Sequence, residues 1–355
     1  MSVSTFDVQI KKVSQSRINQ LDKENIQFGK LYADHMLVAH YENGAWGQPE
    51  IIPFDNLKLS PATTFIHYGQ SIFEGVKAYK NEAGEVNIFR PQDNFRRFNI
   101  SAARMCMPAV PENIFLEGMR QLIDIDRDWI PALADHSLYI RPFMFATDPV
   151  IGVKPSDSYK FMILLSPTGP YYSAPMKIYV EETYTRAAPG GVGFAKNAGN
   201  YGGSMLATQK AKEAGYDQVL WTDAFEHKYL QEVGTMNVFF VLGNKVVTPE
   251  LTEGTILEGV TRDSAITVLK EMGMEVQEVK ITIDELIAFQ KQGLLHEVFG
   301  TGTAATISKI KELRYKDYSM HFDTDHAGVA GELKKRLTAI RHGETTDTHH
   351  WLFKV

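Results

Sequence analysis

The chain has 355 residues, of which 44% are hydrophobic and 11% aromatic, so it can bury sizeable cores and is not a disordered chain. Its 37 basic and 43 acidic residues leave a formal net charge of −6, which gives no electrostatic reason to expect nucleic-acid binding. No apolar run approaches the ~20 residues that span a bilayer, and the N-terminal residues lack the apolar core of a secretory signal. We therefore expect a cytoplasmic protein with small-molecule partners and no membrane association.

Strand and helix signals are mixed in the first half of the chain. Alternating apolar residues predict strands over 31–41, 76–80, 86–90, 137–147 and 159–166. Apolar residues at helical spacing predict helices over 92–106 and 112–129, and Pro91 stands where the first of them can begin. Antiparallel-looking strands combined with two helices are typical of an α+β domain.

Pro and Gly are concentrated at 167–176, which is typical of a linker. We therefore predict a small N-terminal domain over 1–169, a linker over 170–176 and a larger domain over 177–355. In the larger domain, strand signals occur at 177–186, 216–223, 229–242, 245–249, 275–282 and 296–300. Helices are predicted over 203–214, 261–272, 284–291 and 328–342.

Cys106 is the only cysteine, so an internal disulfide and a cysteine-based zinc site are excluded. Its apolar surroundings at a predicted helix end favour a small core residue over a catalytic thiol. Asp323 and Asp325 resemble a fragment of a calcium loop but lack its remaining ligands, which favours a solvated turn. We therefore expect no metal site.

A glycine-rich loop at 189–203 surrounds Lys196. The loop matches neither the dinucleotide fingerprint nor the phosphate-binding loop of nucleotide hydrolases. Glycines let a backbone approach a bulky ligand closely, and a lysine with a deprotonated amine can form a Schiff base with a carbonyl. A solvated loop lysine is the alternative that composition alone leaves open.

Two further side chains suit such a site. Tyr201, five residues after Lys196, can hydrogen-bond an oxygen near a Schiff base, although a half-buried tyrosine with a hydrated hydroxyl is the alternative. Glu232 precedes a very apolar run, where a buried carboxylate needs a partner. A protonated pyridine nitrogen would be a suitable partner, and a solvated edge-strand glutamate is equally compatible with the sequence.

Phosphate groups have three candidate binding segments. Several arginines surround the predicted helix at 92–106, and periodicity does not choose among them. The segment 259–261 precedes a predicted helix, whose N-terminus attracts anions, although a simple threonine cap explains it equally well. The turn at 300–305 matches the loose dinucleotide pattern, but too little chain follows for the fold in which that pattern binds a dinucleotide.

Taken together, these segments resemble the branched-chain amino acid aminotransferases among the fold-type IV pyridoxal-phosphate enzymes, most of all the longer subgroup that includes the animal enzymes. The resemblance runs from about Phe28 to the C-terminus. The motifs that carry it include HYGQSIFEGVKAYK, FRPQDNFRRF, SLYIRPF, GPYY, GGVGFAKNAGNYGGS, EVGTMNVFF, EGVTRDS and EVFGTGTA. It implies a two-domain α+β fold like that of D-amino acid aminotransferase, with a small N-terminal α/β domain and a larger C-terminal domain built on pseudo-barrel sheets.

The resemblance also implies residue roles. Lys196 would form the Schiff base with pyridoxal 5'-phosphate and then shuttle a proton during catalysis. Tyr201 would bond the cofactor's phenolic oxygen and Glu232 its pyridine nitrogen. The phosphate would be bound by Arg97, Val260, Thr261 and Thr303. The pocket for a branched side chain would consist of Phe28, Tyr68, Phe73, Tyr139, Tyr171, Thr235 and Ala304. Arg141 would receive the second carboxylate of glutamate or 2-oxoglutarate.

The implied activity is transamination between leucine, isoleucine or valine and 2-oxoglutarate by a ping-pong route, in a homodimer. Some animal relatives carry a redox-active Cys-x-x-Cys after the Gly-Thr-Ala segment, where this chain has Ala305 and Ser308, so we expect no thiol control there. The alternatives are a D-amino acid transaminase, an aminodeoxychorismate lyase and a non-catalytic module that binds a phosphate. An NAD-linked oxidoreductase is disfavoured by the misplaced glycine pattern.

Overall fold

The structure, a computed structural model, describes residues 7–22, 25–133, 135–172 and 174–355. The chain is divided into two compact units. The first unit contains the described residues up to Pro170 together with Ala195–Ala198 and Ile340–Val355, and the second contains those of 171–194 and Gly199–Ala339. The segment with Lys196 thus belongs to the first unit. The domain limits expected from the sequence stay a prediction.

A sheet of ten strands forms the first unit within the described residues, with the order β1-β4-β2-β9-β8-β6-β7-β19. β3 pairs with β2, and β5 pairs with β8. The strands are β1 (Gln9–Ile10), β2 (His35–Glu42), β3 (Ala45–Trp46), β4 (Glu50–Pro53), β5 (Ser71–Phe73), β6 (Val76–Lys80), β7 (Val86–Phe89), β8 (Ser137–Ala146), β9 (Tyr159–Thr168) and β19 (Leu352–Lys354). The helices are α1 (Thr64–Tyr68), α2 (Pro91–Arg104), α3 (Gly118–Ile125), a π-helical turn (Asn113–Glu117) and the 3-10 turns Ile18–Gln20 and Arg127–Trp129.

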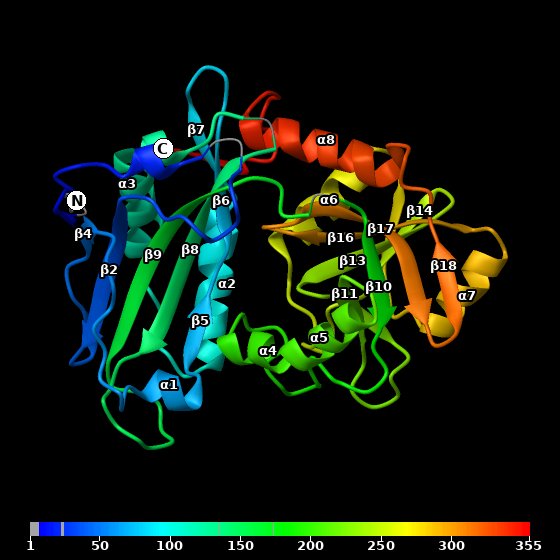
Figure 1. Cartoon of the computed structure of the whole chain (residues 1–355), viewed down its shortest axis with the longest axis horizontal. Helices are drawn as coiled ribbons and strands as arrows, with labels where there is room; N and C mark the ends of the chain where they lie inside the picture. Colours follow the sequence, from blue (N-terminus) through cyan, green and yellow to red (C-terminus); the bar gives the residue numbers. More distant parts are fainter. Residues whose placement is uncertain (1–6, 23–24, 134, 173) are drawn as a thin grey trace. The chain divides into compact units, whose positions relative to one another are not determined.

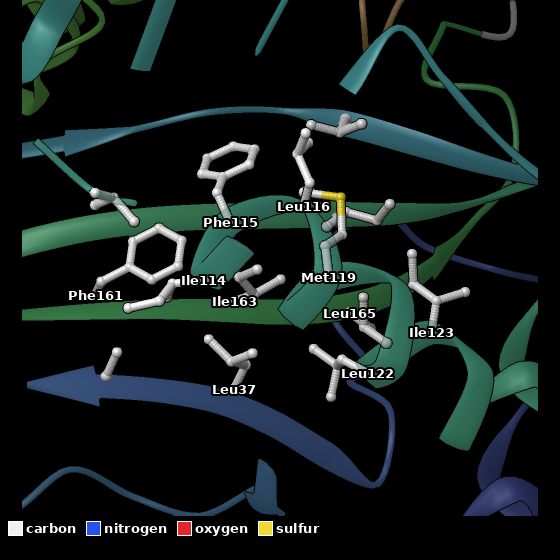
Figure 2. Close-up of a cluster of buried hydrophobic side chains, with 14 of the residues drawn as sticks. Leu37, Ile114, Phe115, Leu116, Met119, Leu122, Ile123, Phe161, Ile163 and Leu165 are labelled. Carbon is white, nitrogen blue, oxygen red and sulfur yellow. The ribbon is translucent and has the colours of Figure 1, made fainter. Parts of the chain in front are cut away.

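The core of this unit forms where α3 and the preceding π-helical turn pack on the central strands (Figure 1). Phe161, Ile163 and Leu165 alternate along β9, so they share one face of the sheet. Figure 2 shows these side chains meeting Phe115 and Met119, which recur at helical spacing. Each buried side chain of this size contributes roughly 1.5–3 kcal/mol of transfer free energy to folding. Together these side chains hold the sheet firmly against the helices.

A barrel is the centre of the second unit. Its sheet has nine strands within the described residues, in the order β12-β11-β10-β17-β16-β13-β14-β15, and β12 also pairs with β13. That pairing closes β10, β11, β12, β13, β16 and β17 into a ring, which confirms the expected pseudo-barrel. The strands are β10 (Met176–Val180), β11 (Gln218–Thr222), β12 (Leu230–Val233), β13 (Met236–Leu242), β14 (Lys245–Thr248), β15 (Glu275–Glu278), β16 (Leu295–Gly302), β17 (Thr306–Tyr315) and β18 (Tyr318–His321).

The helices after residue 197 are α4 (Ala198–Gly203), α5 (Met205–Glu213), α6 (Val260–Glu271), α7 (Ile283–Lys291) and α8 (Gly328–His342). The predicted helices at 261–272, 284–291 and 328–342 are confirmed within a residue. The helix predicted over 203–214 is α5, within two residues at each end, and the short helix α4 precedes it. Among the described residues, no helix combines the length and apolar character that crossing a membrane requires.

The sequence-based interpretation of Cys106 is wrong. Helix α2 ends at Arg104, and Cys106 has a φ of +53°, a left-handed conformation that turns the chain sharply. Its side chain is exposed, and Met107 enters the core in its place. The segment around Cys106 does pack against the core, but Met107 and not Cys106 is the residue that is buried there.

Candidate functional site

The backbone around Lys196 is fixed by β5 and α2. The N–H of Phe73 donates to the Lys196 carbonyl over 3.0 Å, and Ile72 forms an antiparallel bridge with Asn197. The Lys196 N–H donates to Ser101 Oγ over 2.9 Å. The glycine-rich loop thus places this lysine at the edge of the first unit's sheet, held from two sides by backbone hydrogen bonds.

Two cationic side chains contact the Phe73 ring. Lys196 Nζ lies 4.8 Å from the ring centroid, and the guanidinium carbon of Arg141 lies 4.6 Å from it. Both distances are within cation–π range. Arg141 Nη2 also donates to the Tyr139 hydroxyl over 3.0 Å. Within the described residues, Arg141 Nε is buried and makes no hydrogen bond, so this guanidinium has a donor available for an oxygen-rich ligand.

The Tyr139 hydroxyl lies directly against Gly75. A Cβ built on Gly75 would stand 2.4 Å from that oxygen, so a larger residue there would displace the phenol. The Tyr139 ring also meets the Phe28 ring edge-on, with 4.8 Å between centroids. Phe28, Phe73 and Tyr139 therefore form an aromatic cluster with one arginine at its edge, all within the first unit.

Arg97 is bound to a fully buried carboxylate. Its Nε donates to Glu74 Oε1 over 2.7 Å and its Nη2 donates to Glu74 Oε2 over 2.8 Å. Asn94, one helical turn earlier on α2, donates to the same Oε2 over 2.8 Å. Burial by itself would raise the pKa of Glu74, but the charge and hydrogen bonds of Arg97, the charge of Lys196 and the Asn94 amide together lower it.

Glu232 and Thr235 lie in one hairpin of the second unit. The run 229–242 forms β12 and β13 rather than one strand, and Gly234, with a φ of +58°, and Thr235 make the turn. Glu232 is buried, accepts the Leu257 N–H over 2.7 Å, and pairs with Arg186 Nε over 2.9 Å. The partner that the sequence argument required is thus supplied in part by an arginine 46 positions earlier in the chain.

A small cavity in the second unit collects three of the predicted residues. Its lining comprises Tyr201, Glu232 and Thr235 with Arg186, Asn200, Ser204, Gly234 and Leu257. The lining brings a carboxylate, a phenol and hydroxyls of the second unit to one point.

Helix α6 begins at Val260, and no side chain caps its N-terminus. Asn237 donates to the Leu257 carbonyl over 2.9 Å, and its side chain fills the space beside Gly259. Asn237 is also the register partner of Thr301 on β16. Among the described residues, the Thr301 hydroxyl is buried without a hydrogen-bond partner. A helix N-terminus without a side-chain cap and an unsatisfied hydroxyl are the features of an anion site.

The predicted site residues therefore fall into two groups. The first unit holds Phe28, Tyr68, Phe73, Arg97, Tyr139, Arg141 and Lys196. The second unit holds Tyr171, Tyr201, Glu232, Thr235, Val260, Thr261, Thr303 and Ala304. Thr303 and Ala304 lie in the turn between β16 and β17. Tyr68, at the end of α1, and Tyr171 are largely exposed within their units, and the roles of all these residues stay predictions.

Sequence reasoning missed Glu74, Ser101 and Arg186. Asn94, Arg97 and Ser101 recur at i, i+3 and i+7, so helical spacing on α2 could have indicated the shared face. Glu74 is an acidic residue inside the apolar run after β5, the kind of buried charge that demands a partner. Arg186 carries no local signal, because its partner lies on a distant strand. No group of three or more potential metal-ligating side chains lies together in the described part of the chain.

Comparisons with known proteins all match this chain to aminotransferases. The family model described as amino-transferase class IV matches residues 71–313. A probable branched-chain-amino-acid aminotransferase of Staphylococcus aureus is 49% identical over 93% of both chains. Branched-chain-amino-acid aminotransferase 2 of Bacillus subtilis is 47% identical, over 94% of this chain and 93% of its own.

A similar fold is found among solved structures. The branched-chain amino acid aminotransferase from Escherichia coli is 27% identical with a TM-score of 0.71, and the match covers 89% of this chain and 98% of that one. The branched-chain amino acid aminotransferase from T.th., solved in complex with N-(5'-phosphopyridoxyl)-L-glutamate, is 29% identical with a TM-score of 0.71. That match covers 89% of this chain and 97% of the other.

Proposed function

Because this chain belongs to the class IV aminotransferase family, we propose that it transfers the amino group of leucine, isoleucine or valine to 2-oxoglutarate, giving L-glutamate and branched-chain 2-oxo acids. The observation that supports this substrate pair most directly is the arginine at the edge of an aromatic cluster. Phe73 and Tyr139 offer apolar surface to a branched side chain, and Arg141 has a buried Nε without a partner in the described residues. One pocket could then accept both an aliphatic and an acidic side chain.

The proposed cofactor is pyridoxal 5'-phosphate, and the residues present fit its groups. When bound, this cofactor supplies an aldehyde that takes the amino group and a pyridine ring that accepts electrons. The uncapped start of α6, with Val260 and Thr261, and the unsatisfied Thr301 hydroxyl match a phosphate. Thr303, in the turn after β16, would add a hydroxyl. Arg97 would also hold the phosphate.

Glu232 fits the pyridine nitrogen because a carboxylate accepts several hydrogen bonds, and Arg186 pairs with this buried carboxylate over 2.9 Å. Tyr201 lines the same cavity, where its phenol can donate to the ring oxygen. Both side chains would orient the ring without entering the reaction.

Lys196 performs the proton transfer in this proposal. Its ε-amine would first hold the cofactor and, once the substrate has displaced it, would take the proton from the substrate α-carbon and deliver it to C4′ of the cofactor. The backbone bonds to Phe73 and Ser101 fix where this amine can reach. The same residues serve both halves of a ping-pong reaction, because the second half reverses the first with the acidic substrate.

We also infer a homodimer. Ile66 on α1 is 53% exposed, and Ile151 and Val153 are 69% and 88% exposed. Helix α1 and the segment 148–153 are joined by hydrogen bonds from Thr64 Oγ1 to the carbonyls of Asp148 and Val150. The three apolar side chains therefore form one exposed patch on the first unit. Such a patch is typical of a protein–protein interface, and light scattering should give twice the chain mass. A cytoplasmic location stays a prediction.

The test is the visible absorption spectrum of the purified protein with pyridoxal 5'-phosphate. L-leucine should remove the coloured band and 2-oxoglutarate should restore it, since the two half-reactions oppose each other. A coloured protein that ignores L-leucine but responds to D-alanine would instead be a D-amino acid transaminase. Release of pyruvate from aminodeoxychorismate would identify a lyase. A protein that stays colourless, or a band that no amino acid changes, would contradict transamination altogether.

A further inference from the structure

We propose that Glu74 is a positioning residue that sets the direction in which Arg97 presents its guanidinium to the cofactor's phosphate. The proposal rests on the proposed function and adds a residue to it. Glu74 itself would touch neither cofactor nor substrate, and it would act through Arg97.

The geometry of the pair fixes one edge of the guanidinium. Glu74 binds the Nε and Nη2 atoms of Arg97 with two hydrogen bonds of 2.7 and 2.8 Å, one to each carboxylate oxygen. A bidentate carboxylate defines the plane and the rotation of a guanidinium, which a single contact does not. Arg97 therefore has one orientation from which to meet an anion.

Glu74 is in turn fixed by its own surroundings. Asn94 donates to Oε2 over 2.8 Å, and the Gly75 N–H donates to the same oxygen over 3.1 Å. The Glu74 N–H donates to the Pro142 carbonyl over 2.7 Å, which ties the residue to β8. Both the carboxylate and its backbone are thus held before any ligand arrives.

Burial and charge argue against a purely structural ion pair. The Glu74 side chain is 0% exposed, and burying a charge is costly unless it is paired and hydrogen-bonded. An apolar residue could fill the same space at no such cost. The charges of Arg97 and Lys196 both act on this one carboxylate and lower its pKa, so the pair lies where positive charge gathers.

The position of Glu74 in the chain links it to the lysine as well. It follows Phe73 directly, and the Phe73 N–H is bonded to the Lys196 carbonyl. The bonds that hold this stretch of backbone, from the Phe73 and Glu74 N–H groups, do not involve the Glu74 carboxylate, so Glu74→Gln keeps them. The substitution should therefore disturb the phosphate-binding arginine while the backbone that carries the lysine stays in place.

The test compares affinity for pyridoxal 5'-phosphate with affinity for pyridoxal, which lacks the phosphate. In the apo form of the Glu74→Gln variant, affinity for pyridoxal 5'-phosphate should fall about 10- to 100-fold, the range for removing a group that orients a ligand-binding residue. Affinity for pyridoxal should change by less than about 3-fold, a difference of under ~0.7 kcal/mol. Equal losses for both compounds, or no loss for either, would overturn the proposal.

Three further variants sharpen the result. Glu117→Gln is a matched control, because Glu117 makes the same two-bond pair with Arg120 on α3, and it should leave the affinity ratio unchanged. In an Arg97→Gln background, Glu74→Gln should cause no additional loss of selectivity, since the residue acts through Arg97. If Glu74→Gln does not fold, Asn94→Ala should show the same selective loss at smaller size, and an unchanged ratio there would overturn the proposal.

Leucine turnover by the unmodified protein, measured in parallel, keeps the two proposals apart. The unmodified protein could bind pyridoxal 5'-phosphate in preference to pyridoxal and still not transaminate leucine. That result would contradict leucine as the substrate, and the ratio of the two affinities in Glu74→Gln would still decide the role of Glu74. If the unmodified protein transaminates leucine and Glu74→Gln leaves the ratio intact, the assignment of Glu74 fails alone.

Discussion

Arg186 Nε lies 2.9 Å from Glu232 Oε2, and both side chains are more than nine-tenths buried. Arg186 Nη1 also donates to the Thr255 carbonyl over 2.8 Å, so the guanidinium bridges the β12 carboxylate and the chain ahead of α6. The pair thus stabilises the cavity wall on which Tyr201 and Thr235 also lie. Its burial makes it sensitive to the loss of either partner.

The first prediction concerns this pair. Arg186→Gln should lower the free energy of unfolding by about 3–5 kcal/mol, because it leaves the Glu232 carboxylate buried without its cation. Urea denaturation of the apo protein measures the effect. Arg336→Gln is the control, since the Arg336–Glu332 pair on α8 has a similar distance of 2.8 Å but is exposed, and its loss should cost less than about 1 kcal/mol. Equal effects of the two substitutions would contradict the argument.

The second prediction concerns Lys196. Lys196→Ala should reduce turnover of leucine at least about 100-fold, because no other amine would move the proton. Borohydride treatment should leave pyridoxal 5'-phosphate covalently attached to the unmodified protein and not to the variant. Lys210→Ala removes an exposed lysine on α5 whose ammonium contacts the Tyr184 hydroxyl, and it should alter neither result. Full turnover by Lys196→Ala would remove the basis of the proposed function.

The third prediction separates the two substrates. Arg141→Gln should lower kcat/KM for glutamate about 10- to 100-fold, since a hydrogen bond to a charged group contributes roughly 1.5–3 kcal/mol. The value for leucine should change by less than about 3-fold, because an aliphatic side chain makes no such bond. Steady-state kinetics with each donor decides the point. A parallel loss for both substrates would place Arg141 outside the recognition of the acidic side chain.

The fourth prediction concerns Asp223, which follows β11. Its carboxylate accepts hydrogen bonds of 2.8 to 3.1 Å from four backbone N–H groups, those of Phe225, Glu226, Lys228 and Tyr229. Burial alone would raise the pKa of Asp223, but these bonds outweigh it and lower the pKa to about 2.

A lowered pKa in the folded state means that the stabilisation is present above the unfolded value near 4 and is lost as the pH falls toward 2. Asp223→Asn should therefore cost roughly 1–2 kcal/mol at neutral pH, and the difference from the unmodified protein should shrink between pH 4 and pH 2. Denaturation midpoints across that range provide the measurement. Asp317→Asn, at an exposed position, serves as the control and should show no such trend. A difference that stays constant with pH would show that these hydrogen bonds do not depend on the charge.

The sequence by itself indicated the helices well where apolar spacing was regular, as in α6, α7 and α8. It also singled out Lys196 as a candidate, because a lysine among glycines is a local feature, and the role of this lysine stays a prediction from resemblance. Strand β17 was missed because Lys309, Lys311 and Glu312 interrupt its apolar residues. The buried Ile310 and Leu313 are three positions apart, at a register shift, so the strand shows no regular alternation. The closure of the barrel was an expectation from resemblance, since strand pairing depends on contacts between distant segments.

The tertiary structure decided the partners of the charged groups. Periodicity did not choose among the arginines around α2. In the fold, Arg97 is the one that pairs with the fully buried Glu74, which lies 23 positions earlier in the chain. The sequence left open whether Glu232 is solvated or buried with a partner, and the fold buries this carboxylate and brings Arg186 to it. The physical reason is the same in both cases. The periodicity of one element reports which face is buried, whereas a buried charge is stabilised by a group that only the folding of distant segments can bring within hydrogen-bond distance.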